Sequence, residues 1–212
     1  MRIKLLIFLF ITSSLYAEFK ATISPIPPNI KQKMIGVTWH RGCPVPLNDL
    51  RYIKMTYINF FYQDRVGEMI VHKSVAKDVV DIFHKLYDMR YPINKMKPIY
   101  HYRGNDWLSI ENDNTSAFNC RKLTGNRGKW SNHAYGRAID INPIENPYIS
   151  RSGRIAHKES YKFRNRNHDI RRVHDKAVLS RYDKVVKLFK SHGWIWGGDW
   201  NSIKDYQHFE KR

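Results

Sequence analysis

The chain has 212 residues, of which 42% are hydrophobic and 14% are aromatic, and its formal net charge is +18. This length fits one domain or at most two small ones, is sufficient to bury a core, and with this aromatic content argues against a disordered chain. The two cysteines exclude a four-cysteine zinc site and a disulfide-dense scaffold.

The N-terminal residues are typical of a secretory signal peptide. Arg2 and Lys4 supply a positive start, residues 5–11 form an apolar run, and Ala17 is the expected last residue removed. An uncleaved N-terminal anchor is the alternative, although no apolar run reaches the roughly 18–20 residues of a conventional spanning helix. We therefore expect residues 1–17 to be a signal peptide and the protein to be exported to the periplasm or cell envelope, with no membrane span after cleavage.

The first part of the mature chain predicts two strands and one helix. Three prolines within residues 18–41 predict an extended arm around the domain. Residues 52–62 and 67–72 are rich in β-branched, aromatic and other apolar residues and predict strands. Apolar residues at helical spacing predict a helix over 75–87, with Ser74 as its N-cap.

The second part alternates short strands with loops before a final helix. We expect strands at 98–102, 115–121 and 137–142, and a loop at 103–114. Apolar residues at helical spacing predict a helix over 176–191, and a last sheet segment begins with 194–196. Short strands interspersed with two helices predict an α+β fold with a small mixed or antiparallel sheet and flanking helices.

Residues 151–176 form a basic segment without clean periodicity. Its two interpretations are a lid that contacts polyanions and, more simply, a solvated basic loop, which we favour. Its nine basic residues are Arg151, Arg154, Lys158, Lys162, Arg164, Arg166, Arg171, Arg172 and Lys176.

The charge and the cysteines are both interpreted through the predicted export. Removal of residues 1–17 takes away Arg2 and Lys4 and no acidic residue, which lowers the net charge from +18 to +16. Outside the cytoplasmic membrane the available polyanions are peptidoglycan carboxylates, lipopolysaccharide and teichoic acids, so we expect no nucleic-acid partner. Cys43 and Cys120 form either one disulfide or two buried free thiols, and the sequence leaves both open.

The strand at 137–142 places a carboxylate opposite the core. Ile139 and Ile141 point to one side of an extended strand, and Asp140 points to the other beside the small Ala138. Gly136 permits a tight backbone that brings His133 to the same place. Imidazole and carboxylate are zinc ligands, so the pattern predicts a metal site.

A catalytic zinc needs a third protein ligand and an open position. His208 is the best third ligand, and Asp205 is close enough in sequence to act as a general base. Positions i and i+3 of a regular strand face apart, so this pair requires a turn or bulge at residues 206–207. The alternative is that these histidines are ordinary surface or core residues, as we expect for the other histidines of the chain.

Two motifs of this region resemble a known family. Ser131-x-His133-x-x-Gly136-x-Ala138-x-Asp140, followed by Asp205-x-x-His208, resembles the signature of the zinc D-Ala-D-Ala carboxypeptidase and L-Ala-D-Glu endopeptidase family, the VanX/VanY-like metallopeptidases. The longer stretches 114–121 (NTSAFNCR), 130–143, 146–148 and 193–200 are similar to one branch of it. The likeness extends from about residue 67 to the C-terminus, so we divide the chain into an N-terminal arm and first strand (18–66) and a zinc peptidase catalytic domain (67–212).

The resemblance implies a hedgehog/DD-peptidase type of α+β fold and one zinc ion per chain. The ion is expected on His133, Asp140 and His208, with Asp205 as the base toward the attacking water. The expected reaction is hydrolysis of an amide bond in peptidoglycan stem peptides, by a DD-carboxypeptidase or an L-Ala-D-Glu endopeptidase. The aspartate form of the base leans slightly toward the endopeptidase.

The resemblance also suggests further site residues. Arg121 is expected to act on the scissile carbonyl or a substrate carboxylate, with a structural salt bridge as its alternative. Ser116 and Ser131 are expected to bind substrate or to orient the first ligand. We assign Asp199 to the substrate pocket, and Glu210 is a candidate to hydrogen-bond a metal ligand.

A non-enzymatic interpretation remains open. An exported cationic module could bind cell-wall or surface polyanions and keep a structural zinc. The basic segment favours this interpretation, whereas Asp205 argues against it because a binding module needs no base. A secreted nuclease would fit the charge, but the motifs resemble no nuclease signature. The sequence does not indicate the oligomeric state.

Overall fold

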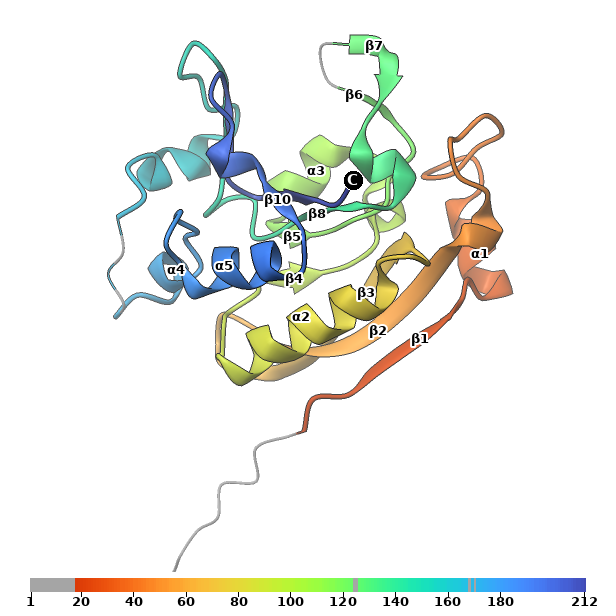
Figure 1. The fold of residues 1–212 in the computed structure, drawn as a ribbon, viewed down its shortest axis with the longest axis horizontal. Coiled ribbons are helices and arrows are strands. Elements are labelled where there is room, and N and C mark those ends of the chain that lie inside the picture. The colour runs from red at the N-terminus through yellow and green to blue at the C-terminus, as the bar shows by residue number, and fades with distance from the viewer. Residues whose placement is uncertain (1–17, 124–125, 168, 170) are drawn as a thin grey trace, which may run out of the picture.

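The structure is a computed structural model that describes residues 18–123, 126–167, 169 and 171–212. The predicted signal peptide, residues 1–17, lies outside the described residues. Within the described part, no helix is long and apolar enough to cross a membrane. The elements form two tiers in Figure 1, an N-terminal sheet with α2 below and the short strands of the C-terminal half above.

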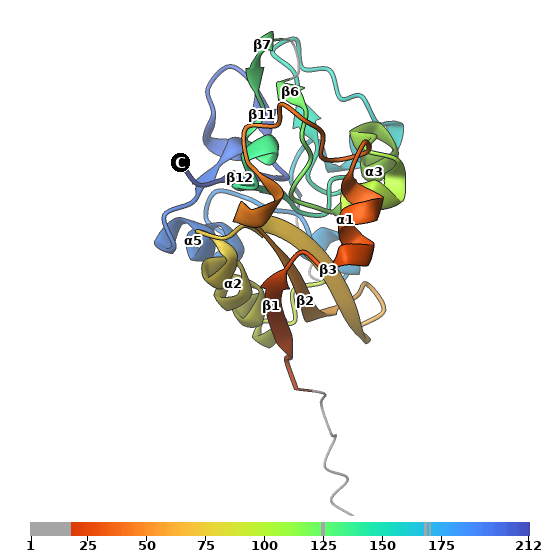
Figure 2. The ribbon, with the colours of Figure 1, turned by 90° about the vertical axis from the view of Figure 1, so that its right-hand side faces the viewer.

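The lower tier is an antiparallel sheet in the order β1-β2-β3, formed by Ala21–Pro25, Leu50–Ile58 and Asp64–His72. Both of its faces are covered. Ile53 and Met69 lie opposite each other and pack against α2 (Ala76–Asp88), whereas Tyr52 and Ile70 face the other side. There they pack with α1 (Pro28–Met34), and Figure 2 shows the two helices on either side of the sheet. This explains why both strands carry buried apolar residues on both of their faces.

The N-terminal residues differ from the predicted extended arm. Residues 21–25 add a strand to the edge of the sheet, and Pro28 occupies the first turn of α1, where its missing N–H costs nothing. The predicted boundary between residues 66 and 67 lies inside β3. Ser74 does not cap α2; Val75 takes that position, and the Ser74 hydroxyl lies 2.7 Å from His72 Nδ1.

The upper tier is a second antiparallel sheet in the order β10-β12-β8. Its strands are Ile195–Trp196, His208–Glu210 and Ala138–Asp140. Ile139 of β8 lies opposite Phe209 of β12, and both side chains are fully buried in the core cluster that also contains residues of α2. The sheet therefore rests on the core with this side and is free to present Asp140 and His208 on its other side.

Two predicted stretches form helices where other structure was expected. Residues 98–102 were predicted as a strand but include the 3₁₀ helix Ile99–Tyr102, and the predicted loop 103–114 contains α3 (Asp106–Glu111), capped by the side chain of Asn105. The remaining elements are β4 (Lys95–Met96), β5 (Asn114–Thr115), β6 (Lys122–Leu123), β7 (Asn126–Trp130), β9 (Tyr148–Ile149), β11 (Lys204–Asp205) and the 3₁₀ helices Leu47–Asp49, Asn132–Tyr135, Lys158–Phe163 and Gly197–Asp199. The observed class is mixed α+β with small, mainly antiparallel sheets.

The helix predicted over 176–191 is shorter than expected. Only α5 (Lys184–Ser191) forms within it, and the short helix α4 (Val173–Lys176) ends where the predicted helix was expected to begin. The carbonyl of Ala177 accepts hydrogen bonds from Tyr91 and Asn146, and the N–H of Leu179 donates to Asn146. These tertiary hydrogen bonds use backbone groups that a continuous helix would need for itself.

The two cysteines form a disulfide. Cys43 and Cys120 are joined with their Cα atoms 5.9 Å apart. The bond connects the loop that follows α1 to the segment between β5 and β6, across 77 residues of sequence. It therefore ties the N-terminal part of the fold to the segment that carries Arg121.

Candidate metal centre

Asp140 and His208 are brought together by strand pairing. β8 and β12 are antiparallel, and Asp140 lies directly opposite His208 in their register. Side chains of directly opposed residues project from the same face of a sheet. His208 Nδ1 lies 3.0 Å from Asp140 Oδ1.

His133 reaches the same point from the short 3₁₀ helix Asn132–Tyr135. The Ser131 hydroxyl accepts a hydrogen bond from the His133 N–H and caps this turn. Gly136 ends it with a φ of +65°, and a Cβ atom there would lie 2.6 Å from the backbone nitrogen of His72. Both observations explain why glycine is required at this position.

The ring of His133 is oriented by a backbone carbonyl. Its Nδ1 lies 2.6 Å from the carbonyl oxygen of Ala117, which accepts the ring N–H. Its Nε2 consequently faces the site, 3.2 Å from His208 Nδ1 and 3.2 Å from Asp140 Oδ2. Hydrogen bonding at the second ring nitrogen is the usual way in which a metal-binding histidine is fixed.

The donor set fits a zinc ion. One atom each of His133, Asp140 and His208 lies within 4.8 Å of the others, and both imidazoles are buried. Two nitrogens and one carboxylate oxygen are the ligand types of a catalytic zinc site with an open fourth position. These three residues would hold the metal.

The charges at the site favour a bound cation. Burial disfavours the charged form of His208, but its hydrogen bonds to Asp140 and Glu210 outweigh this and raise its pKa to about 10. Burial acts against the charge of Asp140 as well, yet the neighbouring His133 and His208 hold the pKa of that carboxyl well below its usual range. The carboxylates thus stabilise positive charge here, and a metal ion competes with protons for such a site.

Asp205 lies across a turn from His208. β11 ends at Asp205, residues 206–207 form the turn, and β12 begins at His208, as the i, i+3 spacing required. Asp205 Oδ1 is buried, and no described residue hydrogen-bonds it. Burial raises the pKa of Asp205 to about 6, with the charge of His208 acting against the shift and that of Asp140 adding to it. A carboxylate with a free, buried oxygen is suited to accept a proton.

Glu210 supports the outer side of His208. Its Oε2 lies 3.3 Å from His208 Nε2 and also accepts from the side chain of Asn132, while its Oε1 accepts from Arg212 Nε at 3.1 Å. The hydrogen bond to Nε2 leaves Nδ1 of His208 facing Asp140 and His133. This is the geometry expected of a group that orients a metal ligand.

The donor set lies in the wall of a cavity of about 690 Å³. Ser116, Ser131 and Arg121, all predicted site residues, also line this cavity. The backbone of Ser116 pairs with that of Asp140 in both directions, so it supports a metal-binding residue as well. Arg121 forms a salt bridge with Asp106 at the cavity wall, which was the structural alternative for this residue.

The structure does not bring Asp199 into the cavity. Its carboxylate is paired with Arg181 and Lys190, and it does not belong to the lining residues. Trp194 and Trp196 are buried in the core, whereas Trp200 lines the cavity with its ring 5.4 Å from that of His208. Asp199 and Trp200 are adjacent in sequence, yet Asp199 forms ion pairs outside the cavity and only Trp200 contributes to the cavity wall.

Two aromatic side chains that line the cavity were not predicted from the sequence. Trp107 of α3 and His157 of the basic segment both line it, with their ring centroids 3.9 Å apart. His157 had been treated as an ordinary histidine and 103–114 as a loop, so no pattern in the sequence connected them. The amide of Asn132, beside the first ligand, was also missed.

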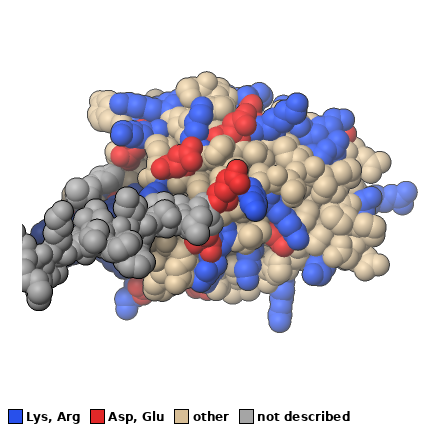
Figure 3. All heavy atoms as spheres, turned by 90° about the horizontal axis from the view of Figure 1, so that it is seen from below, with Lys and Arg blue, Asp and Glu red and all other residues tan. Residues whose placement is uncertain are grey.

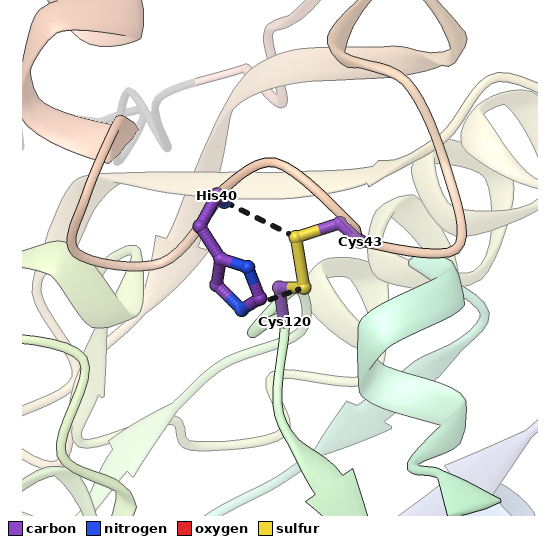
Figure 4. A group of neighbouring side chains, drawn as sticks. All are labelled: His40, Cys43 and Cys120. Atoms are coloured by element: carbon purple, nitrogen blue, oxygen red, sulfur yellow. Dashed lines mark hydrogen bonds between the residues drawn. A yellow bond between two sulfur atoms is a disulfide. The ribbon is translucent and has the colours of Figure 1, made fainter.

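A second cluster has ligand-type residues but no free thiolate. His40, Cys43 and Cys120 converge as Figure 4 shows, with His40 Nε2 3.5 Å from Cys120 Sγ and the His40 N–H donating to Cys43 Sγ at 3.2 Å. Because the two sulfurs are bonded to each other, they offer no thiolate to a metal.

The positive charge does not form one compact patch on the face drawn in Figure 3, where Lys and Arg are spread among acidic and uncharged residues. In the basic segment 151–176, eight of the nine Lys and Arg side chains are exposed, as expected of a solvated loop. Arg166 is the exception.

Residues 124–211 match the family model described as D-alanyl-D-alanine carboxypeptidase. The match covers less than half of the chain but contains His133, Asp140, Asp205 and His208, and Glu210 as well. It does not include the β1-β2-β3 sheet or the disulfide. No solved structure matches the chain.

Proposed function

We propose, because residues 124–211 match the family model described as D-alanyl-D-alanine carboxypeptidase, that this protein is an exported zinc peptidase. Its reaction is hydrolysis of an amide bond in the stem peptides of peptidoglycan. The hedgehog/DD-peptidase type of fold and a location in the periplasm or cell envelope belong to the same proposal. The observation that carries it is the convergence of His133, Asp140 and His208 beside Asp205, whose buried Oδ1 has no hydrogen-bond partner among the described residues.

The mechanism assigns separate tasks to the residues of the site. Zinc, when bound, supplies a Lewis acid that polarises the scissile carbonyl and lowers the pKa of water. Asp205 takes a proton from the attacking water and gives it to the leaving amine. Arg121 offers guanidinium N–H groups to the carbonyl oxygen or to a substrate carboxylate, while Asp106 fixes its orientation.

Two bonds remain candidates. A DD-carboxypeptidase removes the terminal D-Ala, whereas an L-Ala-D-Glu endopeptidase cuts inside the stem peptide. The matched family model carries the first activity in its description, and the aspartate at position 205 leans toward the second by resemblance. The cavity of about 690 Å³ that contains the donor set is also lined by Arg121, Trp107 and His157, and we expect it to accommodate a peptide chain in either case.

One experiment tests the proposal and identifies the bond. The mature protein is analysed for metal content and incubated with purified muropeptides, with and without a chelator, and the products are identified by mass spectrometry. We expect about one zinc per chain and chelator-sensitive release of D-Ala or cleavage between L-Ala and D-Glu. A folded protein without zinc would contradict the assignment of the three ligands.

An Asp205→Asn variant separates catalysis from metal binding. Loss of its base lowers turnover by about 10²–10⁴-fold, while zinc content stays at the wild-type level. Asp199→Asn is the matched control, because Asp199 lies outside the cavity. Zinc binding without any cleavage by the wild type would instead favour the cationic binding module with a structural zinc.

A further inference from the structure

Arg166 differs from every other basic residue of its segment. The other eight Lys and Arg side chains between 151 and 176 are exposed, whereas that of Arg166 turns toward the protein. Its backbone has a φ of +53°, a conformation that residues other than glycine rarely adopt. A positively charged residue that turns inward at the cost of backbone strain requires a structural explanation.

The guanidinium of Arg166 connects three separate segments. Nη1 donates to the carbonyl oxygens of Glu145 at 2.6 Å and Phe163 at 3.2 Å. Nη2 and Nε donate to the carbonyl oxygen of Leu179 at 2.7 and 3.2 Å, and Nη2 also donates to the side chain of Asn146. Burial lowers the pKa of Arg166 to about 10, so the group remains charged at neutral pH.

The same guanidinium covers the ring of Tyr206. Its Cζ lies 4.3 Å from the ring centroid, within the range of a cation–π interaction. Tyr206 belongs to the two-residue turn between Asp205 and His208. The backbone of this residue is also held, because its N–H donates to Pro147 and its carbonyl accepts from Trp196 Nε1 at 2.8 Å.

The turn at residues 206–207 brings Asp205 and His208 to the same side of the structure. Residues three apart on a regular strand face opposite sides, yet Asp205 and His208 must serve the same reacting group. The turn at 206–207 brings them to one cavity, and both residues line it. Its conformation therefore determines the distance between the proposed base and the third metal ligand.

We propose that Arg166 is a positioning residue that fixes the 205–208 turn through Tyr206 and thereby holds Asp205 and His208 in register. The inference rests on the proposed function. Arg166 is then the one Lys or Arg of the basic segment with a role at the site, while the other eight are exposed to solvent. It also explains the choice of arginine, because only a planar group with five donors can bind three carbonyls and an amide while stacking on a ring.

The first test compares three variants of the full mature chain. Arg166→Met removes the charge and the donors at similar length, and Arg166→Lys keeps the charge without the planar group. Arg151→Met is the matched control, since it removes the same charge from an exposed position of the segment. Zinc affinity is measured by competition with a chromophoric chelator, and kcat and KM are measured with muropeptides.

We expect Arg166→Met to lower zinc affinity and kcat by about tenfold each, with KM changed less than twofold, as for groups that orient metal ligands. Arg166→Lys recovers only part of this loss, and Arg151→Met retains wild-type values. Wild-type zinc affinity and kcat in Arg166→Met would overturn the proposal.

The second test addresses the route through Tyr206, and its two single variants at Tyr206 remain informative if Arg166→Met fails to fold. Tyr206→Phe keeps the ring and should retain zinc affinity, whereas Tyr206→Leu removes the ring face and should lose about as much as Arg166→Met. In the double variant Arg166→Met/Tyr206→Leu the two losses should not add, because both remove one interaction. Full additivity, or wild-type behaviour of Tyr206→Leu, would refute the inference.

The two readouts separate this inference from the proposed function. If the wild type binds zinc but cleaves no muropeptide, the peptidase proposal fails, and the zinc affinities of the variants still decide the role of Arg166. If the wild type cleaves and Arg166→Met is indistinguishable from it, the role of Arg166 fails and the peptidase proposal stands.

Discussion

Two clusters of metal-ligand residues occur in the described part of the chain, and only in one of them are no donor atoms covalently bonded to each other. His133, Asp140 and His208 point their lone pairs at a common space, and their outer atoms are held by Ala117 and Glu210. In the cluster of His40, Cys43 and Cys120, the two sulfurs are bonded to each other. Residue type and proximity are therefore insufficient to identify a metal site; the donors must also be unused.

The two clusters also differ in what surrounds them. The first is buried at the wall of the cavity, next to Asp205 Oδ1, which has no hydrogen-bond partner in the described part of the chain. In the second, His40 is exposed and the disulfide joins two segments of the fold. We infer that the first cluster serves chemistry and the second serves stability, and four predictions test this division.

The largest effect is expected from His208→Ala, compared with His40→Ala. Structural zinc sites with four ligands bind with about 10–16 kcal/mol, so one ligand contributes about 3 kcal/mol and its loss weakens binding roughly a hundredfold. Turnover should be lost as well. His40→Ala should retain one zinc per chain and full activity. Metal analysis after dialysis distinguishes the two variants. Equal zinc loss in both would contradict the assignment of zinc to the cluster that contains His208.

The largest effect on stability alone is expected from Cys43→Ala/Cys120→Ala. A disulfide that closes a loop of 77 residues stabilises by about 4 kcal/mol in the chain-entropy model. We expect the midpoint of urea unfolding to fall accordingly, with zinc content unchanged at one per chain. Zinc content of the wild type in the presence of a dithiol reductant is the complementary measurement. A second zinc bound after reduction would contradict a purely stabilising role of the second cluster, because the sulfur cluster would then also be a metal site.

The parts of the site that could be predicted are those that depend on neighbours in sequence. The alternation of side chains along a strand placed Asp140 on the face of β8 that is opposite to the face of Ile139. The i, i+3 spacing required the turn between Asp205 and His208. Gly136 was assigned its turn for the reason that its positive φ confirms. For α2, periodicity alone identified the helix within one residue at each end.

The parts that could not be predicted depend on contacts between distant segments. The helix expected from 176 was interrupted because Ala177 and Leu179 hydrogen-bond to Asn146, more than 30 residues away. Asp199 was expected in the pocket but pairs with Arg181 and Lys190 instead. No local pattern reveals such partners, since the competing hydrogen bonds exist only once the chain is folded.

A second group of buried acids differs from Asp140 in the direction of its pKa shift. Asp113 and Glu145 are both buried, burial and the charge of Glu145 raise the pKa of Asp113, and His174 Nδ1 lies 2.6 Å from Glu145 Oε1. Burial raises the pKa of Glu145 from its ordinary value of 4.5 to about 7, whereas two histidines lower that of Asp140. Here a proton, rather than a cation, relieves the cost of burying a carboxylate.

This difference predicts a pH dependence of stability. Between pH 4.5 and about 7 the folded state binds more protons at Glu145 than the unfolded state, so the free energy of unfolding falls as pH rises through this window. The decrease amounts to roughly 3 kcal/mol and should be absent in Glu145→Gln, whose amide imitates the protonated acid. Urea unfolding of both proteins at a series of pH values measures it. Parallel pH curves for the two would show that Glu145 does not titrate in this range.

The smallest effect is expected from Glu210→Gln, which leaves the three ligands intact. The amide is uncharged and binds the Nε2–H of His208 more weakly, so the ring is held less firmly with Nδ1 toward the metal position. Loss of such a group lowers zinc affinity by about tenfold, or about 1.4 kcal/mol. Chelator competition measures this at one pH, and Asp199→Asn serves as the control carboxylate outside the cavity. Unchanged affinity in Glu210→Gln would mean that the pairing of β12 with β8 orients His208 without help from its outer side.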